Sequence, residues 1–459
     1  RASWNYALDR AVELARELQQ PLVVLEALRV GYEWASDRMH RFVLDGMRAN
    51  RAAFAGSEAR YVPYVEPRAG EGKGLVDALA ARACAVVTDD FPCFFLPRMA
   101  STVGARSPVL FEKVDANGLL PTRLAGKAHP TAYVFRRMLQ KALPAHLDGR
   151  PRADPFAGVT LPKLAALPDV FKRMAPATEA MLDGNTLDAL PIDHTVGPVA
   201  FRGGTDAARA ELQRFLAQRL LRYADDRNHP DHDASSNLSP WLHFGHLSAH
   251  EVFDALADWE DWLPEKLGAR AAGQREGFWN MGASADAFLD QLVTWRELGY
   301  ATCVFDPNYA TFESVPNWAR ATLAKHAEDR REWTYSLDQL EAAATHDAVW
   351  NAGQRELVET GRMHNYLRML WGKKVLEWSR SPEAAFDVLV HLNNKYAVDG
   401  RNPNSYSGIL WTFGKYDRPW APERPIFGSV RFMSSANTVK KLRIKRYLER
   451  WGAATSSAT

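Results

Sequence analysis

The chain has 459 residues, enough for two or three domains and a large hydrophobic core. Hydrophobic residues make up 46% of it and charged residues 24%, as in ordinary globular proteins, and the net charge is only +2. Because basic and acidic residues nearly balance, a surface that binds nucleic acid has to be made by segregating charge onto one face.

The three cysteines, Cys84, Cys93 and Cys303, lie far apart and form no Cys-x-x-Cys pair. This spacing argues against a disulfide framework, a zinc ribbon and a four-cysteine iron–sulfur cluster. No apolar run approaches the length of a membrane span, and the first residues are typical of a helix rather than of a signal peptide. We therefore expect a cytoplasmic protein in a reducing compartment, with no membrane contact.

Residues 1–125 alternate between helical and strand-like patterns, which predicts an α/β domain built on a doubly wound parallel sheet. The run 21–28 is short and apolar, as in strands buried on both faces. Further strands are predicted at 59–65, 85–89 and 108–114. Because the chain opens on a helical pattern, we expect the first strand of this sheet to be absent.

Prolines punctuate residues 126–206, where long periodic runs are missing, and this predicts an inter-domain connector with short helices. Residues 207–459 are helical in pattern almost throughout, which predicts an all-α second domain. Its clearest predicted helices lie at 207–223, 248–258, 285–298, 337–344, 356–379 and 382–394.

Two tryptophans, Trp371 and Trp378, are seven residues apart, which places them on the same face of a predicted helix. A third, Trp350, lies one helix upstream. Tryptophan is easily oxidised, so a row of these residues can carry an electron between a buried cofactor and the surface. Core packing explains aromatic residues equally well, and the spacing alone leaves both interpretations open.

Ser235, Ser236 and Ser239 stand at the start of a helical pattern. Hydroxyl groups and the free N–H groups of a helix start suit an anion such as a pyrophosphate. An ordinary serine N-cap explains the same residues, so the pattern alone does not decide between them.

Histidines and basic residues form two further clusters. The histidines are close in sequence, but no carboxylate or cysteine completes a ligand set, so we expect no metal site there; they are His229, His232, His243 and His246. The basic residues near the C-terminus favour either a solvated helix face or contacts with DNA phosphates; they are Arg431, Lys440, Lys441, Arg443, Lys445 and Arg446.

Four segments, in order and with matching spacing, resemble the photolyase/cryptochrome family: 227–245, 288–298, 350–378 and 392–404. Within them, Asp-Gly-Arg-x-Pro-Asn and Arg-Met-x-Trp-x-Lys-Lys are most similar to the class II cyclobutane pyrimidine dimer photolyases, in a bacterial branch with glutamine in place of an active-site glutamate. The resemblance implies an α/β antenna-type domain at 1–125 and a helical FAD-binding domain at 207–459.

The resemblance also implies a function. We expect a deoxyribodipyrimidine photo-lyase, which uses light and non-covalent FAD to split cyclobutane pyrimidine dimers. An electron would pass from excited reduced flavin to a dimer flipped out of the helix. The implied partner is UV-damaged DNA, the implied state is a monomer, and a second, antenna chromophore is left open in presence and identity.

The residues that the resemblance assigns fall into three groups. Catalytic roles fall to Trp350, Trp371, Trp378, Gln291 and Asn393, the last facing flavin N5. FAD-binding roles fall to Tyr223, Ser235, Ser236, Asn237, Leu238, Ser239, Phe288, Arg368, Asp399 and Gly400, although Arg368 and Asp399 also fit a plain buried salt bridge. Roles in holding DNA or the dimer fall to Arg227, Asn228, Trp295, Asn365, Met369, Trp411 and Arg431.

The chain departs from the class II pattern at the lesion site. Gln291 stands where those enzymes carry a glutamate that contacts the dimer, and glutamine keeps the shape but loses the charge and the proton. The (6-4) photolyases also have glutamine there, but they carry histidines where this chain has Asn365 and Met369. A cryptochrome-like blue-light photoreceptor that signals through flavin photoreduction is therefore the alternative hypothesis.

Overall fold

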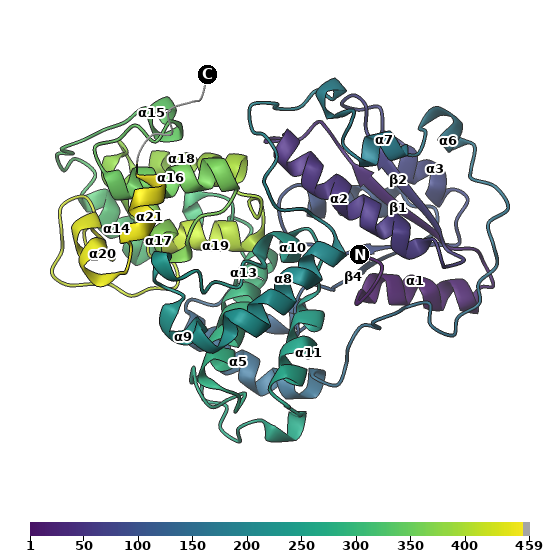
Figure 1. Ribbon diagram of the computed structural model, residues 1–459, viewed down its shortest axis with the longest axis horizontal. Helices are drawn as coiled ribbons and strands as arrows, with labels where there is room; N and C mark the ends of the chain where they lie inside the picture. Colours follow the sequence, from purple (N-terminus) through teal and green to yellow (C-terminus); the bar gives the residue numbers. More distant parts are fainter. Residues whose placement is uncertain (453–459) are drawn as a thin grey trace. The chain divides into compact units, whose positions relative to one another are not determined.

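The computed structural model describes residues 1–452 of the chain, which divide into two compact units (Figure 1). The first unit comprises residues 1–122, 145–214 and 237–259, and the second comprises 123–144, 215–236 and 260–459. The predicted connector at 126–206 is thus divided between the two units. Among the described residues, no helix combines the length and the apolar character that crossing a membrane requires.

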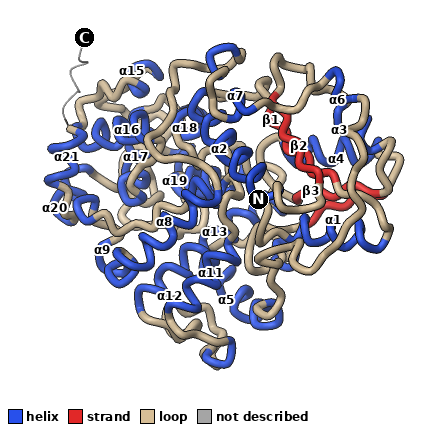
Figure 2. Tube along the Cα trace, turned by 45° about the vertical axis from the view of Figure 1, so that its right-hand side comes forward, coloured by secondary structure: helices blue, strands red, loops and turns tan. Residues whose placement is uncertain are grey.

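The first unit contains the strands of the protein and the helices that pack around them (Figure 2). The strands are β1 (Val23–Leu28), β2 (Arg60–Val65), β3 (Ala85–Asp89) and β4 (Leu110–Val114). The helices that lie wholly in this unit are α1 (Tyr6–Glu17), α2 (Asp37–Phe54), α3 (Leu75–Ala80), α4 (Leu96–Arg106), α6 (Val170–Arg173), α7 (Glu179–Leu182), α10 (Ser239–His243) and α11 (Ala249–Trp259).

The predicted continuous sheet is present as two separate parallel ladders among the described residues. β1 pairs with β2, with Val23 opposite Arg60, and β3 pairs with β4, with Ala85 opposite Leu110. The strands are parallel and alternate with helices, as the sequence predicts. No hydrogen-bonded ladder joins the two pairs in the described chain, so the doubly wound sheet is interrupted.

Leucines of the proline-rich stretch lie in the core of the first unit rather than in a free connector. Leu182, Leu187 and Leu190 pack with Leu44 and Met47 of α2 in one buried cluster. The backbone reinforces this packing, since Asp37 N–H donates to the carbonyl of Asp193 and Arg38 N–H to that of Val196. Short helices between prolines therefore cover α2 instead of bridging open space.

The regular elements of the second unit are helices in the part of the chain that the structure describes. Its α-helices are α5 (Ala132–Ala142), α9 (Tyr223–Asp226), α12 (Ala283–Leu289), α13 (Arg296–Phe305), α14 (Asn317–Lys325), α15 (Leu337–Glu341), α16 (Ala348–Thr360), α17 (Asn365–Trp378), α18 (Pro382–Tyr396), α19 (Pro403–Thr412), α20 (Ser435–Lys441) and α21 (Lys445–Trp451). Helix α8 (Thr205–Gln218) is shared, since the unit boundary falls after Arg214.

Local signals fix where α16 begins and ends. The Asp347 side chain accepts hydrogen bonds from the N–H groups of Val349 and Trp350, at 3.1 and 3.0 Å, as an N-cap. Gly361 ends the helix in the left-handed conformation at φ 67°, which glycine adopts without a Cβ penalty. These two ends place Trp350 in the first turn, on the side that faces α17.

A π-turn, η7 (Asp290–Trp295), interrupts the helical path between α12 and α13. A π-turn departs from regular α-helical hydrogen bonding, and such turns are frequent at functional sites. A buried ion pair holds it: Arg136 of α5 donates from Nε to Asp290 Oδ1 at 2.8 Å. The turn carries Gln291 and Trp295, so this ion pair determines where both side chains lie.

Replacing Arg136 with methionine should therefore destabilise the second unit by about 3–5 kcal/mol, because Asp290 is left as a buried charge without its partner. Denaturant unfolding of the purified protein measures the change. Exposed Lys141 on the same helix supplies the control, since Lys141→Met should change stability by less than about 0.5 kcal/mol. The double variant Arg136→Met/Asp290→Leu should regain most of the loss, and failure to regain any would argue against the buried charge as its cause.

Candidate functional site

The three predicted tryptophans form one continuous row in the second unit. The Trp350 and Trp371 rings are nearly parallel, with an interplanar angle of 7° and centroids 6.5 Å apart. Trp378 meets Trp350 edge-on at 5.5 Å. All three side chains are buried, at 1–3% exposure. The row therefore runs from Trp371 through Trp350 to Trp378, with each ring in contact with the next.

Two hydrogen bonds join α16 to the inner tryptophan of this row. Trp350 Nε1–H donates to the backbone carbonyl of Trp371 at 3.1 Å, and Trp371 Nε1–H donates to Gln354 Oε1 at 2.9 Å. Gln354 was not predicted as a site residue. The sequence feature that could have identified it is its position: Gln354 follows Trp350 by four residues and therefore shares the same helical face.

Aromatic contacts continue from Trp378 to the surface. Trp378 contacts the rings of Tyr335 at 5.1 Å and His346 at 5.5 Å. Trp333 stacks on His346 at 4.5 Å and is 45% exposed. Trp378 is thus an interior residue, and the aromatic path meets solvent at Trp333.

Polar residues that are predicted to contact the flavin lie near one another in the second unit. An Arg368 guanidinium nitrogen lies 3.6 Å from Asp399 Oδ1. Gly400 follows Asp399, and a Cβ at Gly400 would lie only 2.9 Å from the carbonyl oxygen of Asn393. The position therefore has to be glycine for the backbone to turn beside Asn393.

The two adjacent asparagines of α18 have different surroundings. Asn394 is hydrogen-bonded to other residues of the protein. Its Oδ1 accepts from the backbone N–H of Arg401 at 2.8 Å, and its backbone carbonyl accepts from the Arg401 side chain. Asn393 donates from Nδ2 to Asn394 Oδ1 at 3.2 Å, and its own Oδ1 accepts no hydrogen bond within the described chain. Asn393 is thus the one whose carbonyl oxygen is left for another group.

Tyr223 and Phe288 are brought together in an aromatic cluster. Their rings meet edge-on at 5.6 Å, and Phe215 packs against Phe288 at 4.7 Å. Burial raises the pKa of the Tyr223 phenol. The Arg227 guanidinium lies 5.3 Å from the centre of the Tyr223 ring, so this predicted DNA residue is fixed by a cation–π contact.

The serine segment is less helical than the sequence predicts. Ser235, Ser236, Asn237 and Leu238 precede the helix, and α10 begins only at Ser239 and is five residues long. No side chain caps it. The boundary between the two units falls between Ser236 and Asn237, and Asn237 has a left-handed backbone at φ 60°.

Three buried polar atoms of the second unit test whether the residues fit the flavin that the resemblance implies. Gln354 Nε2, His364 Nδ1 and Arg227 Nε have no hydrogen-bond partner within the described chain. Buried donors without partners are costly, and they persist where a ligand supplies the missing group. Burial also lowers the pKa of His364 to about 4, so this imidazole is neutral. Gln354 Nε2 and Arg227 Nε are donors left for another group, and they are compatible with a polar cofactor in the second unit.

The predicted lesion residues lie on three elements of the second unit. Gln291 and Trp295 are half-buried on the π-turn, Trp411 is half-buried near the end of α19, and Met369 is half-buried on α17. Asn365, at the start of α17, is exposed.

Beneath Trp411 lies a buried lysine that was not predicted as a site residue. Lys373 is 0% exposed; its Nζ donates to the carbonyl of Thr412 and lies 5.0 Å from the Trp411 ring centre. Burial lowers the pKa of Lys373 to about 7, and the nearby Arg431 charge acts in the same direction, against Asp417. This amine therefore changes charge near neutral pH.

Arg431 is engaged within the protein. It donates from Nε to Asp417 Oδ2 at 2.7 Å, and its guanidinium lies 4.0 Å from the centre of the Trp420 ring. On the other residues of the basic run, Arg443 N–H donates to His229 Nδ1 at 3.1 Å, and Arg446 donates to the carbonyl of Asp231. Part of this run thus tethers the loop that carries Arg227.

The predicted histidine cluster makes contacts other than metal ligation. His246 Nδ1 accepts from the Gly204 N–H at 3.0 Å, and burial lowers its pKa to about 3. His232 forms an ion pair with Asp226 at 2.7 Å.

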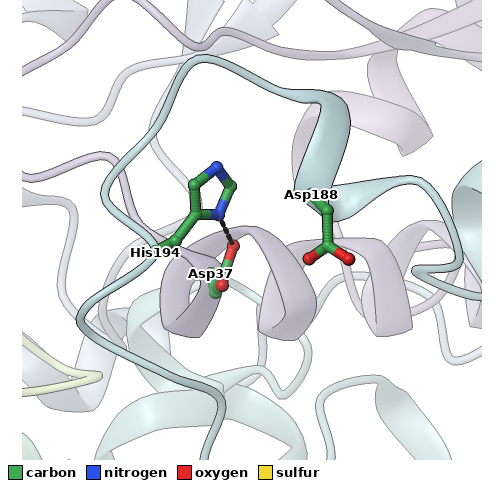
Figure 3. A group of neighbouring side chains, drawn as sticks. All are labelled: Asp37, Asp188 and His194. Carbon is green, nitrogen blue, oxygen red and sulfur yellow. Dashed lines mark hydrogen bonds and ion pairs between the residues drawn. The ribbon is translucent and has the colours of Figure 1, made fainter.

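One other group, Asp37, Asp188 and His194, brings metal-type ligand atoms close together among the described residues (Figure 3). His194 Nδ1 lies 2.9 Å from Asp37 Oδ1, and its Nε2 lies 3.1 Å from the carbonyl of Leu190. The hydrogen bond to the Asp37 carboxylate raises the pKa of His194. Both ring nitrogens of His194 are engaged, one by Asp37 and the other by the Leu190 carbonyl, so contacts within the protein account for this group.

Solved structures with the same fold define the class of protein. The class III photolyase of Agrobacterium tumefaciens superposes with a TM-score of 0.68 at 16% identity, over 98% of this chain and 84% of that one. The cryptochrome of Synechocystis superposes with a TM-score of 0.68 at 14% identity, over 98% and 86%. At such identities the likeness establishes the fold, which is that of the photolyases and cryptochromes.

Relatives found by sequence comparison narrow the class of protein further. The deoxyribodipyrimidine photo-lyase of Methanothermobacter thermautotrophicus is 34% identical over 454 residues, which cover 98% of this chain and 92% of that protein. Those of Arabidopsis thaliana and Potorous tridactylus are both 32% identical, over 85% and 78% of their lengths. No protein-family model matches the chain. The chain belongs to the photolyase/cryptochrome family.

The Lys373 amine should leave a signature in the pH dependence of stability. Between about pH 7 and 10.5 the unfolded lysine holds a proton that the folded one lacks, so stability should rise with pH, by up to about 1.4 kcal/mol per unit. Lys373→Met should remove this slope. Denaturant unfolding at a series of pH values gives the difference between wild type and variant. The same difference for exposed Lys440→Met should be flat, and parallel curves for Lys373→Met would contradict the buried, neutral amine.

Proposed function

We propose that this protein is a light-driven, FAD-dependent deoxyribodipyrimidine photo-lyase that splits cyclobutane pyrimidine dimers in UV-damaged DNA. The observation that carries the proposal is the buried tryptophan row, in a chain 32–34% identical to photo-lyases over nearly its whole length. A row of contacting, oxidisable rings can carry an electron between the flavin and the surface. The class II type, with glutamine at 291, is part of the proposal.

FAD, when bound, supplies light absorption and the electron that opens the cyclobutane ring. Residues of the second unit would hold it. Arg368 offsets the negative charge of reduced flavin, Asp399 accepts hydrogen bonds from its sugar chain, and Asn393 offers a free carbonyl oxygen beside the ring. Tyr223, Phe288 and Gly400 shape the space, and Ser235 and Ser236, the serines of this segment that belong to the second unit, would meet the pyrophosphate.

The lesion would be held between flat and apolar side chains. Trp295 and Trp411 present rings that can sandwich the two bases of a flipped dimer, with Met369 beside them. Gln291 would hydrogen-bond the dimer from the π-turn. Arg227 and Asn228 would lie beside the pocket, and Arg431, already paired with Asp417, would approach the DNA backbone as part of a rigid unit.

A second chromophore would belong in the first unit. Ligands of parallel α/β folds bind at the carboxyl ends of the strands. Aromatic residues gather where β1 and β3 end: Tyr32 lies 6.0 Å from Phe95, and Trp34 stacks on Phe94 at 6.1 Å. The photolyase of Sulfolobus tokodaii, which shares the fold with a TM-score of 0.65, is described with two FAD molecules and a light-harvesting role. An antenna pigment at these aromatic residues is therefore part of the proposal.

Purified, reduced protein should split cyclobutane dimers in a defined oligonucleotide under blue light and leave (6-4) products intact. The second result follows because Asn365 and Met369 replace the histidines that would supply a proton. Gln291→Glu should raise splitting per absorbed photon, because a glutamate could share its proton with the dimer radical anion. A hydrogen bond to such a charged group contributes about 1.5–3 kcal/mol. Gln291→Met is the matched control and should weaken dimer binding. If wild type and Gln291→Glu both leave dimers intact while flavin photoreduction is normal, the photoreceptor hypothesis replaces this one.

Photoreduction of oxidised flavin should require the tryptophan row. Trp371→Phe and Trp350→Phe should each lower its rate at least tenfold, since each breaks the contact between neighbouring rings. Trp262→Phe, a buried tryptophan of the same unit that lies outside the row, serves as control and should photoreduce like wild type. Absorbance of the flavin under steady blue light, with an external thiol reductant that returns electrons to the row, gives the rates. Equal rates in all three variants would reduce the row to core packing.

A further inference from the structure

Gln354 is bonded to the inner tryptophan and is completely buried. Its Oε1 accepts the Trp371 Nε1–H at 2.9 Å, and the side chain is 0% exposed. Because an indole nitrogen is a donor only, the amide oxygen has to face it, which fixes the orientation of the amide. The amide Nε2 then has no hydrogen-bond partner within the described chain. Burying an amide N–H without a hydrogen-bond partner costs free energy, which favours a functional reason for glutamine at this position.

The acceptor of an indole N–H matters when the indole is oxidised. Loss of one electron makes the ring a radical cation, and its N–H becomes much more acidic. A basic acceptor, such as a carboxylate, takes the proton and leaves a neutral radical, which traps the electron vacancy where it formed. An amide carbonyl is not basic enough to do so.

Both inner tryptophans donate to such carbonyls. Trp371 donates to the Gln354 side chain, and Trp350 donates to the Trp371 backbone. Two carboxylates lie on α16 near these rings. Asp347, the N-cap, accepts the backbone N–H of Trp350 and not its indole N–H, and Glu356 is engaged by the His364 N–H and the Tyr447 hydroxyl. Beyond Trp378, His346 Nδ1 hydrogen-bonds the Tyr335 hydroxyl.

We propose that Gln354 is a positioning residue that keeps the indole proton on Trp371 during flavin photoreduction, so that the electron vacancy moves outward. This inference rests on the electron-transfer role proposed for the row. One electron leaves Trp371 for the photoexcited oxidised flavin, and the Trp371 radical cation keeps its N–H on Gln354. An electron from Trp350 restores Trp371, and one from Trp378 restores Trp350. Positive charge moves in these steps and no proton does.

The test replaces the amide by its acid. In Gln354→Glu, an ionised carboxylate takes the place of the amide oxygen, so Trp371 should lose its proton when oxidised. Transient absorption of the FAD-loaded protein after a blue flash distinguishes the radical cation from the neutral radical. Wild type should show the cation first. Gln354→Glu should show the neutral radical first, increasingly as pH rises from 6 to 9, and the yield of long-lived charge separation should fall at least tenfold. Gln339→Glu, in an exposed capping box that accepts glutamate, controls for the added charge.

Gln354→Leu keeps the side-chain volume and removes the hydrogen-bond acceptor of Trp371. This variant tests the proposal if Gln354→Glu does not fold. In dark, ¹⁵N-tryptophan-labelled protein, hydrogen exchange of the Trp371 indole N–H should be at least tenfold faster than in wild type. Because leucine is not a base either, the radical cation should still appear first after a flash.

An unchanged cation and unchanged yield in Gln354→Glu would overturn the proposal, as would wild-type exchange of the Trp371 indole N–H in Gln354→Leu. A wild-type protein that forms no tryptophan radical at all would instead overturn the proposed role of the row.

Discussion

The contact of α16 with α17 through Trp350 and Trp371 is the constraint on which the candidate site depends. The two rings stack, and both polar groups of Trp371, its indole N–H and its backbone carbonyl, are bonded to α16. A helix held at one residue by a ring and two hydrogen bonds cannot rotate about its axis. Every other side chain of α17 is therefore fixed in direction by this one contact.

That fixed direction gives α17 two kinds of surroundings. On one side lie the rings of the tryptophan row, bonded only to neutral carbonyl groups. Elsewhere on the same helix are Arg368, which meets Asp399, and Lys373, which is buried against Trp411. Arg368 and Asp399 thus place charge near the proposed flavin, whereas the indole N–H groups of Trp350 and Trp371 face neutral carbonyl oxygens. The ionisable groups nearest the row are Asp347, which accepts the backbone N–H of Trp350, and Lys374, which lies 5.7 Å from the centre of the Trp378 ring.

The sequence predicted those parts of this arrangement that depend on spacing along one element. Trp371 and Trp378 share a helical face because they are seven residues apart, and the alternation of strands and helices follows from local pattern. Pairing with Trp350 needs tertiary contact, and the resemblance to known chains supplied it. Gln354 and Lys373 were missed because a glutamine or lysine in a helix is usually solvated, and only packing reveals their burial. Leu182, Leu187 and Leu190 lack periodicity among prolines, so their place in the core was not visible either.

The division of the chain has a consequence for how such a protein can be made and altered. The backbone passes from one unit to the other after residues 122, 144, 214, 236 and 259. On the ribosome, the α/β unit cannot be completed until residue 259 has emerged, by which time segments of the helical unit are already outside. Neither unit is a contiguous cassette that could be cut out, expressed alone or exchanged between relatives. Diversification of this architecture has to proceed through point substitutions and loop changes rather than through domain shuffling.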